Sequence, residues 1–456
     1  MTVYVVILGL YLAGMFAVGL YGRKYSGTTD GFLTAGRQGT MALITASFMA
    51  SHFGAGFVVG GAEYGASVGF SGIWYGLACS LSYVVFGVFM SKRLHKEGYM
   101  TVSDLLTHRY GNNFTANGFA IFNSVAAVGI MAGQIMAGQR LFQALGMDGF
   151  TGALVCTIIV IVYSAMAGLW GVLMTDLIQM IIGGIGLVVG YAIIFGGSGI
   201  GSLASSLPAG DFEWIAPSWS NYDFLMILVP TTLYGFLSQP SYQRTIASRT
   251  EKVAVWSPFV AAVLLVPLAY IPVAIGMYGK TMFPDMPAGA IFFNVIMQSV
   301  PAVVGALIMA AIIAAIMSTA DSQLLAVTAN IVHDLYQKSI NPKATDRQCT
   351  ILSYVVTVAV GLFGMYVALS FTTIIGLLSF TYSILVASSL VPVLGGFFWK
   401  GATPLGAACA MITGVAVLFL GRYGVINIPY AALTAGIPAL FVFVIVSLAG
   451  PKPKQS

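Results

Sequence analysis

The chain has 456 residues, and only 7% of them are charged, against about 25% in a soluble globular domain. Hydrophobic residues make up 58% of the chain, and its mean hydropathy is +0.92. So few charges cannot cover a surface that faces water, which argues against a soluble enzyme, a nucleic-acid binder and a disordered chain. The composition is typical of a polytopic membrane protein, and the 54 glycines fit closely packed membrane helices.

Apolar stretches along the chain predict the membrane spans, because a helix needs about 20 apolar residues to cross a bilayer. In chain order, thirteen spans are expected at 3–22, 41–69, 71–91, 114–139, 151–170, 173–196, 222–244, 253–279, 301–336, 347–370, 373–397, 403–421 and 429–449. The boundary between the fifth and sixth spans is the weakest, since only the residues around 168–172 make the turn. The first stretch lacks preceding basic residues and a clear cleavage site, so it is interpreted as a mature span.

The lysines and arginines test this count. With the N-terminus outside, all of the 19 basic residues except Arg140, Lys280 and Arg422 fall on the inner side. Cytoplasmic loops of membrane proteins are rich in Lys and Arg, so this bias predicts a cell-membrane protein with its N-terminus outside and its C-terminus in the cytoplasm. The net charge of +5 then faces the inner leaflet of the lipid bilayer, and no nucleic-acid partner is implied. The whole chain, 1–456, is expected to form one transmembrane domain.

Two predicted spans are interrupted. Residues 45–63 contain four glycines, a histidine and several hydroxyls, and residues 230–244 contain two prolines and a glycine. Broken backbone at membrane depth is tolerated only where it faces protein or a water-filled cavity. Two such spans, five positions apart in the order of helices, point to inverted repeats around a midplane site. Kinked packing helices are the alternative, because Gly and Pro are common in membrane spans.

Asp176 and Asp321 are acidic residues within predicted spans. A carboxylate at mid-bilayer costs about 2.5–3.5 kcal/mol on insertion scales, and such residues usually mark an ion or proton path. For Asp176 the alternative is an interfacial acid at the start of a helix.

A face of oxygen-bearing residues surrounds Asp321. Ala315, Ser318, Thr319 and Ser322 follow the spacing of one helical face. Hydroxyl, carbonyl and carboxylate oxygens are hard donors that suit Na⁺. Hydroxyls bonding back to their own helix are the alternative for each single residue, but not for the whole face.

The chain resembles the sodium:solute symporter family, which includes proline, pantothenate and sialic acid symporters. The resemblance is most specific at residues 315–325, 175–179 and 239–244, and residues 98–104 also fit it. Segments 318–322 and 60–63 are most similar to the choline branch. It implies an all-α inverted-repeat fold of the LeuT type. Repeat one would cover about 41–196 and repeat two about 222–397, with one additional helix before them and two after.

The resemblance also implies sodium ions as a co-transported partner. The main sodium site would combine carbonyls at the first break with the hydroxyl face, using Ala50, Phe53, Ala315, Ser318 and Thr319. A second cation site, present in some relatives, would use Asp176, Ser318, Asp321 and Ser322. Two carboxylates near one cation can also share a proton, so proton coupling stays open.

The expected solute is a small polar or anionic molecule such as a carboxylate. The choline branch holds its quaternary ammonium in an aromatic cage, but His52, Gly129 and Ser238 stand where its tryptophans are expected. Candidate solute residues are His52, Phe57, Gln134, Ser238, Gln239 and Tyr242. His52 is equally consistent with packing and bonding a carbonyl freed at the break.

These features predict a secondary symporter that moves the solute inward by alternating access, driven by the sodium gradient. The alternatives are a proton-coupled symporter on the same fold and a membrane-embedded sensor. An enzyme is not expected, because the sequence contains no set of nucleophile and base, nor a metal cluster, at one depth. The identity of the solute and the oligomeric state are not predicted.

Overall fold

The computed structural model describes residues 2–22, 35–99, 101–111, 113–164, 169–426 and 430–450. Arg23, Lys24, Lys452 and Lys454, which contribute to the predicted charge bias, and residue 168 of the predicted turn lie outside these residues. The described part is built of helices, with one isolated parallel bridge between Gly39 and Ser248.

The first half of the chain contains α1 (Thr2–Gly22), α3 (Met41–His52), the π-helix η3 (Ala55–Gly60), α4 (Gly61–Val68), α5 (Ile73–Phe86), α6 (Lys92–Glu97), α7 (Val102–Tyr110), α8 (Asn113–Ala144), α9 (Gly149–Ser164) and α10 (Leu169–Phe195). The second half contains α11 (Asn221–Tyr234), α12 (Gln239–Ala247), α13 (Glu251–Met282), α14 (Ala288–Ser299), α15 (Ala302–Ala329), η8 (Asn330–Ile340), α16 (Asp346–Ser370), α17 (Ile374–Phe398), α18 (Pro404–Arg422), α19 (Ala431–Thr434) and α20 (Gly436–Ala449).

Eight helical stretches in the described residues are long and apolar enough to cross a membrane: Ala55–Glu97, Phe114–Ala144, Val172–Phe195, Glu251–Met282, Ala302–Gln337, Asp346–Ser370, Ile374–Phe398 and Pro404–Arg422. Five shorter apolar helices accompany them: Thr2–Val18, Met41–His52, Gly149–Val162, Ala288–Ser299 and Gly436–Ala449. Each predicted span overlaps helix, whereas α14 falls in a stretch that the sequence left outside the spans. The all-helical class is confirmed, and the count of thirteen spans stays a prediction.

The predicted boundary between the second and third spans lies where the backbone turns. Gly69, between α4 and α5, has a φ of 67°, in the left-handed region that favours glycine. A Cβ at this position would lie 2.2 Å from the carbonyl oxygen of Asp211. The turn therefore packs directly under the long connection between α10 and α11.

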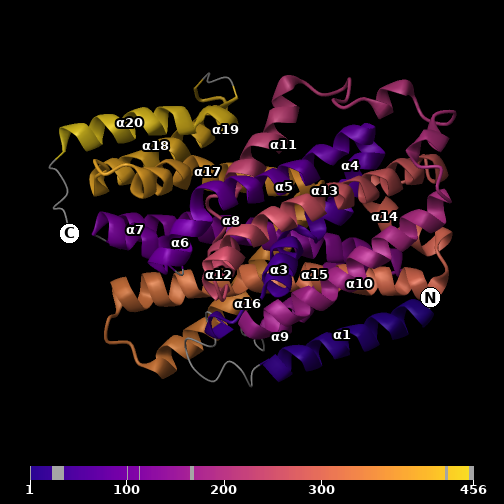
Figure 1. Cartoon of the computed structure of the whole chain (residues 1–456), viewed down its shortest axis with the longest axis horizontal. Helices are drawn as coiled ribbons and strands as arrows, with labels where there is room; N and C mark the ends of the chain where they lie inside the picture. The colour runs from indigo at the N-terminus through magenta and orange to yellow at the C-terminus, as the bar shows by residue number, and fades with distance from the viewer. Residues whose placement is uncertain are drawn as a thin grey trace.

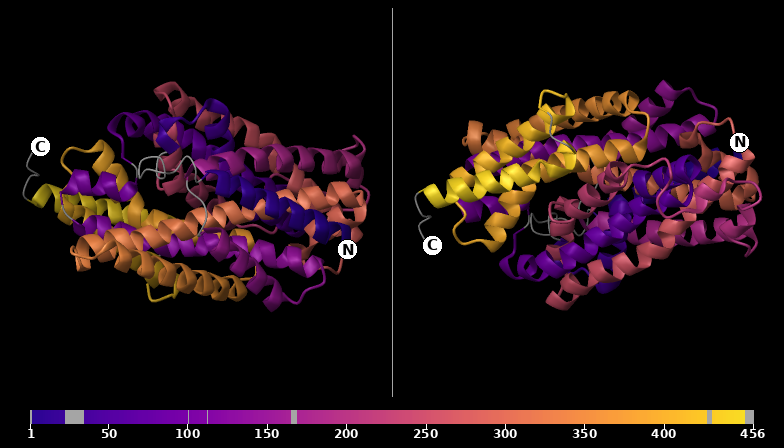
Figure 2. Two further views of the ribbon diagram at one scale, coloured as in Figure 1. Left: turned by 90° about the horizontal axis from the view of Figure 1, so that it is seen from below. Right: turned by 90° about the horizontal axis from the view of Figure 1, so that it is seen from above.

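The helices form an elongated bundle in which α3, α8 and α15 lie between α1 on one edge and α18 and α20 on the other (Figure 1). The chain enters α1 at one end of the long axis and leaves α20 at the opposite end (Figure 2). Glycines let the central helices approach closely. A Cβ on Gly186 of α10 would lie 3.0 Å from the Ile308 side chain of α15.

Close backbone contact also joins α4 to α13. A Cβ on Gly65 would lie 2.2 Å from the carbonyl oxygen of Val273, and one on Gly276 would lie 2.0 Å from that of Ala62. The two helices therefore have no room for side chains at these crossing points.

Both interruptions that the sequence predicts are present. The first interrupted span divides at Phe53 and Gly54: α3 precedes the break, and η3 and α4 follow it. The second divides into α11 and α12, with Pro240 in the first turn of α12, where a missing N–H is tolerated. Both breaks interrupt the regular α-helical hydrogen bonding of their spans.

Candidate functional site

The site begins at the end of α3, where helical hydrogen bonding stops. The Phe53 N–H still donates to the Met49 carbonyl at 2.9 Å, but the Gly54 N–H donates to the His52 carbonyl at 2.8 Å. The last carbonyls of a helix lack partners within it. The Ala50 carbonyl lies in this last turn, so a partner for its oxygen must come from another element.

The hydroxyl face of α15 lies against this end of α3. The Thr319 hydroxyl donates to the Ala315 carbonyl at 3.0 Å and lies 3.5 Å from the Ala50 carbonyl oxygen. Ala50 and Thr319 are 3% and 8% exposed, so three oxygens from two helices meet at a buried point. This chemistry suits a hard cation, and the structure brings these three predicted residues together.

Phe53 and Phe57 pack beside this point. Their ring centroids lie 6.0 Å apart, and a Cβ on Gly183 of α10 would lie 3.0 Å from the Phe53 ring. Both side chains are buried. Phe53 therefore offers a cation only its carbonyl, as the sequence expects.

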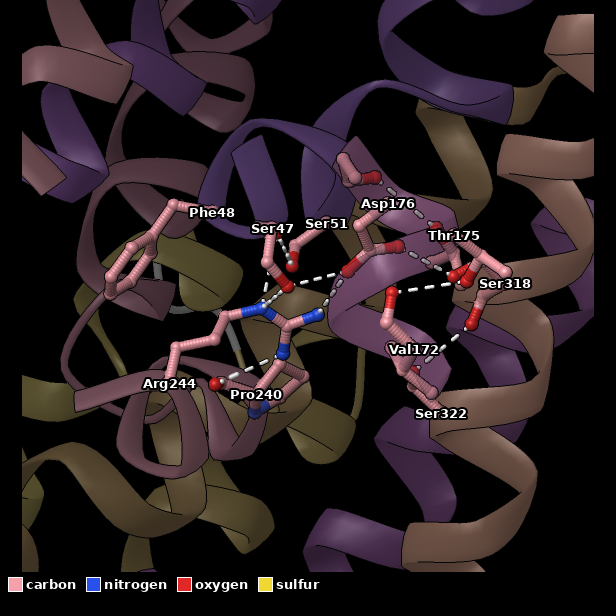
Figure 3. Close-up of polar contacts among 12 residues, drawn as sticks. Ser47, Phe48, Ser51, Val172, Thr175, Asp176, Pro240, Arg244, Ser318 and Ser322 are labelled. Atoms are coloured by element: carbon pink, nitrogen blue, oxygen red, sulfur yellow. Dashed lines mark hydrogen bonds and ion pairs between the residues drawn. The ribbon is translucent and has the colours of Figure 1, made fainter. Parts of the chain in front are cut away.

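Asp176 of α10 lies at the centre of a buried polar network (Figure 3). Its carboxylate accepts hydrogen bonds from Ser47 at 2.5 Å and from Ser318 at 2.8 Å. The side chain is 1% exposed, so Asp176 is buried among the helices, in the second turn of α10. The acid lies within reach of α15 because α10 packs on that helix through glycines.

Arg244 of α12 faces the same carboxylate. Its Nη2 atom lies 3.4 Å from Asp176, its Nε donates to Ser47, and its Nη1 donates to the Pro240 carbonyl at 3.0 Å. Arg244 is 3% exposed, so this basic residue is buried inside the bundle. The short helix that follows the second break turns Arg244 inward. Its position four residues after Pro240 is the sequence feature that could have indicated the contact with the Pro240 carbonyl.

Ser322 and Asp321 lie further along α15. The Ser322 hydroxyl donates to the Ser318 carbonyl at 3.0 Å, the backbone bond that the sequence analysis gives as an alternative. Ser322 also lines a neighbouring cavity, whereas Asp321 is fully buried and does not line that cavity. Of the four residues predicted for a second cation site, Asp176 and Ser318 are in direct contact.

A small cavity adjoins the break and this network. It is lined by Ala50, Ser51, His52, Tyr83, Ile130, Asp176, Tyr234, Ser238, Pro240, Arg244, Ser318, Thr319, Ser322, Gln323 and Tyr382. Tyr234 and Tyr382 stack with ring centroids 4.4 Å apart, and the His52 ring lies 4.7 Å from that of Tyr83. The cavity thus combines aromatic walls with an ion pair on one side.

The predicted solute residues divide into two groups. His52 and Ser238 line the cavity, and His52 Nε2 lies 3.2 Å from the Ser82 hydroxyl. Gln239 and Tyr242 do not line it, because their side chains bond the Val102 N–H at 3.3 Å and the Phe236 carbonyl at 3.1 Å.

The other two candidates also lie outside the cavity lining. Gln134 accepts a hydrogen bond from the Ala55 N–H at 3.0 Å, and the Phe57 ring packs against that of Phe53. Four further lining residues were not predicted, because they lie on four different helices and carry no motif that singles them out: Tyr83, Tyr234, Gln323 and Tyr382.

A second buried ion pair lies apart from the cavity, between Glu63 of α4 and Arg140 of α8. The nearest oxygen and nitrogen atoms lie 3.0 Å apart, and the side chains are 4% and 11% exposed. Arg140 also donates to the Thr372 carbonyl at 2.9 Å, and Glu63 accepts from the Ile374 N–H at 3.2 Å. The pair therefore joins α4, α8 and the start of α17. Arg140 is one of the three basic residues predicted on the outer side.

Curated relatives match nearly the whole chain. The high-affinity proline transporter PutP of Bacillus subtilis is 26% identical and is matched over 97% of both chains. The sodium/pantothenate symporter of Escherichia coli is 26% identical over 96% of this chain and 94% of its own. The high-affinity choline transporter 1 of Drosophila melanogaster is 26% identical over 93% of this chain and 72% of its own.

Solved structures show the same fold. A Na⁺-coupled sialic acid symporter in its substrate-bound outward-open state matches with a TM-score of 0.81 and 18% identity, covering 100% of this chain and 99% of that one. A nucleobase-cation-symport-1 family transporter in a closed conformation matches with a TM-score of 0.62 and 12% identity, over 92% and 95%. The model of the sodium:solute symporter family matches residues 32–414. The chain therefore belongs to the sodium:solute symporter family, a family of sodium-coupled membrane transporters rather than enzymes.

Proposed function

We propose that this protein moves a small polar or anionic organic solute into the cell together with Na⁺, by alternating access. The observation that carries the proposal is the meeting of the Ala50 and Ala315 carbonyls with the Thr319 hydroxyl at the break of the first interrupted span. The family of the chain and its similarity to sodium-coupled transporters support the same conclusion.

Sodium acts as a bridge between two helices. A Na⁺ ion held by Ala50 and Phe53 on one side, and by Ala315, Ser318 and Thr319 on the other, ties the broken backbone of α3 to α15. The cavity borders Ala50 and Thr319, so ordering the break also orders one wall of the cavity. Ion and solute therefore bind with positive coupling, each raising the affinity for the other.

The solute occupies the cavity beside the break. Ser238 and Gln323 supply polar contacts for a carboxylate or similar group, and Arg244 lines the same cavity beside its partner Asp176. Tyr83, Tyr234 and Tyr382 cover the less polar part of the solute. The rest of the lining is mostly polar, which suits a small solute with several hydrogen-bonding groups.

Asp176 and Ser318 form the core of a second cation site, with Ser322 and Asp321 beside them. The direct bond of 2.8 Å between Ser318 and Asp176 supports this assignment. Arg244 shares the Asp176 carboxylate, so a cation bound there competes with or displaces a guanidinium contact. A proton on one of the two acids is the alternative coupling ion.

Alternating access follows from the two interrupted helices. Residues 41–196 and 222–397 act as inverted repeats, and each contributes one broken helix to the central site. Rocking of one group of helices against the other exposes the cavity first outside and then inside. The protein lies in the cell membrane with its N-terminus outside and its C-terminus in the cytoplasm.

Uptake into proteoliposomes tests the proposal. The purified protein is reconstituted and supplied with labelled carboxylates, amino acids, vitamins and sugars at fixed pH and fixed membrane potential. We expect uptake of one solute class only when an inward Na⁺ gradient is present. Uptake that persists without Na⁺ and follows an inward proton gradient would instead support the proton-coupled alternative.

A further inference from the structure

We propose that Gln134 is a positioning residue for the sodium site, and that it holds the break of the first interrupted span rather than binding solute. The inference rests on the sodium site proposed above. It assigns to Gln134 the task of fixing the backbone that presents the Ala50 and Phe53 carbonyls.

Gln134 bonds the first backbone group after the break. Its side chain is 4% exposed, and its Oε1 atom accepts the Ala55 N–H at 3.0 Å. Ala55 begins η3, and the first N–H groups of a helix have no partner within it. Such a group must find a partner inside the protein at membrane depth, and the amide oxygen of Gln134 supplies it.

Gly54 provides the space in which this contact forms. A Cβ on Gly54 would lie 2.9 Å from Gln134 Oε1 and 3.7 Å from the Thr319 hydroxyl oxygen. The side chains of α8 and α15 therefore converge on the same point of the broken backbone. Gln134 lies next to Thr319, the residue that carries the proposed sodium ligand.

Neighbouring glycines hold α8 in this place. A Cβ on Gly133 would lie 3.1 Å from Leu378 of α17, and one on Gly138 would lie 2.3 Å from Cys156 of α9. These close contacts leave α8 little freedom to rotate or slide. The position of the Gln134 amide is consequently set by α8 and not by the break itself.

The hydrogen bond from the Ala55 N–H to Gln134 restricts the conformation of the backbone that leads back to the proposed sodium ligands. The peptide bond is planar, so the direction of this N–H also sets the direction of the Gly54 carbonyl. The Phe53 carbonyl belongs to the preceding peptide, and Ala50 closes the last turn of α3. Without the Gln134 bond, these carbonyls must be ordered by the ion itself, which lowers its affinity.

Two substitutions of similar size test the role. Gln134→Leu removes the acceptor, whereas Gln134→Glu keeps an oxygen at the same place. We expect Gln134→Leu to raise the Na⁺ concentration for half-maximal uptake by about tenfold, because it leaves a buried N–H without its acceptor, and Gln134→Glu, which keeps an acceptor, to need less Na⁺ than Gln134→Leu. The solute KM at saturating Na⁺ should change less than about twofold in both.

Gln143→Leu, on an exposed position of the same helix, is the matched control and should leave the Na⁺ dependence unchanged. Gly54→Ala is an independent second variant, since its methyl group displaces the Gln134 oxygen, and it should reproduce the defect of Gln134→Leu. It also decides the question if Gln134→Leu does not fold.

The readouts separate this inference from the proposed function. A Na⁺-induced shift in melting temperature, measured without solute, should shrink in Gln134→Leu and Gly54→Ala. Unchanged Na⁺ dependence in both variants, or a raised solute KM with normal Na⁺ dependence, would overturn the positioning role. If the wild-type protein itself shows no response to Na⁺, the sodium site is wrong and this role falls with it.

Discussion

Thr319 stands where two helices present oxygens to one point, and its own hydroxyl is one of them. Thr319→Ala removes this oxygen, and Thr319→Ser keeps it. We expect the alanine variant to raise the Na⁺ concentration for half-maximal uptake by about tenfold, because contacts to charged groups contribute about 1.5–3 kcal/mol and about 1.4 kcal/mol is a factor of ten.

The serine variant should retain most of the affinity, and Thr328→Ala is a matched control. Thr328 also lies on α15 and bonds its own helix at 2.9 Å, but it does not line the cavity. Equal Na⁺ dependence of Thr319→Ala and Thr328→Ala would remove Thr319 from the ligand set.

Asp176 has two tasks that substitutions can separate, because it neutralises Arg244 and faces Ser318. Asp176→Asn leaves a buried guanidinium without its carboxylate, which typically costs about 3–5 kcal/mol of stability. We expect the double variant Asp176→Asn/Arg244→Gln to recover part of the melting temperature while its Na⁺ requirement stays raised. A double variant with both properties restored would show that Asp176 only balances Arg244.

At the scale of elements, the ion pair of Glu63 and Arg140 ties α4, α8 and α17 together. Glu63→Gln removes the charge and leaves Arg140 buried. We expect it to lower the melting temperature strongly, in line with about 3–5 kcal/mol for a broken buried pair.

Asp211→Asn is the control, because the pair of Lys280 and Asp211 is partly exposed and such pairs contribute about 0–1 kcal/mol. Similar melting temperatures of the two variants would mean that the Glu63 pair carries no special stability.

Helices were more predictable than the side chains that fill the centre. The two breaks follow from Gly and Pro in otherwise apolar stretches, and the position of Thr319 opposite Ala50 follows from the family resemblance. The burial of Arg244 was not predicted, because a basic residue near a span end usually faces water. Gln134 and Gln239 are polar at membrane depth, but sequence alone cannot tell a solute contact from a bond to backbone.

At the scale of the whole molecule, the coupling of ion and solute should appear as linked stabilisation. A ligand at a hundred times its dissociation constant stabilises the folded state by about 2.7 kcal/mol. We expect Na⁺ alone to raise the melting temperature, K⁺ to leave it unchanged, and the transported solute to add a larger shift with Na⁺ than without it. Equal solute shifts with Na⁺ and with K⁺ would contradict the coupling.

The family and the helical class were predictable because they rest on many positions spread over the chain, and the family match from 32 to 414 confirms the first. The solute is harder to predict, because Tyr83, Tyr234 and Tyr382 come from separate helices. Their meeting depends on how each helix is rotated, which one sequence does not record.

The crossing of α4 and α13 has a consequence for how the molecule moves. Backbone lies directly on backbone at Gly65 and Gly276, so neither helix can slip past the other without a collision. In the proposed transport cycle we therefore expect α4 to move together with α13, and the change in backbone angles to fall at Phe53 and Gly54. A methyl group added at Gly276 would collide with the Ala62 carbonyl, so we expect Gly276→Ala to separate the two helices and slow transport.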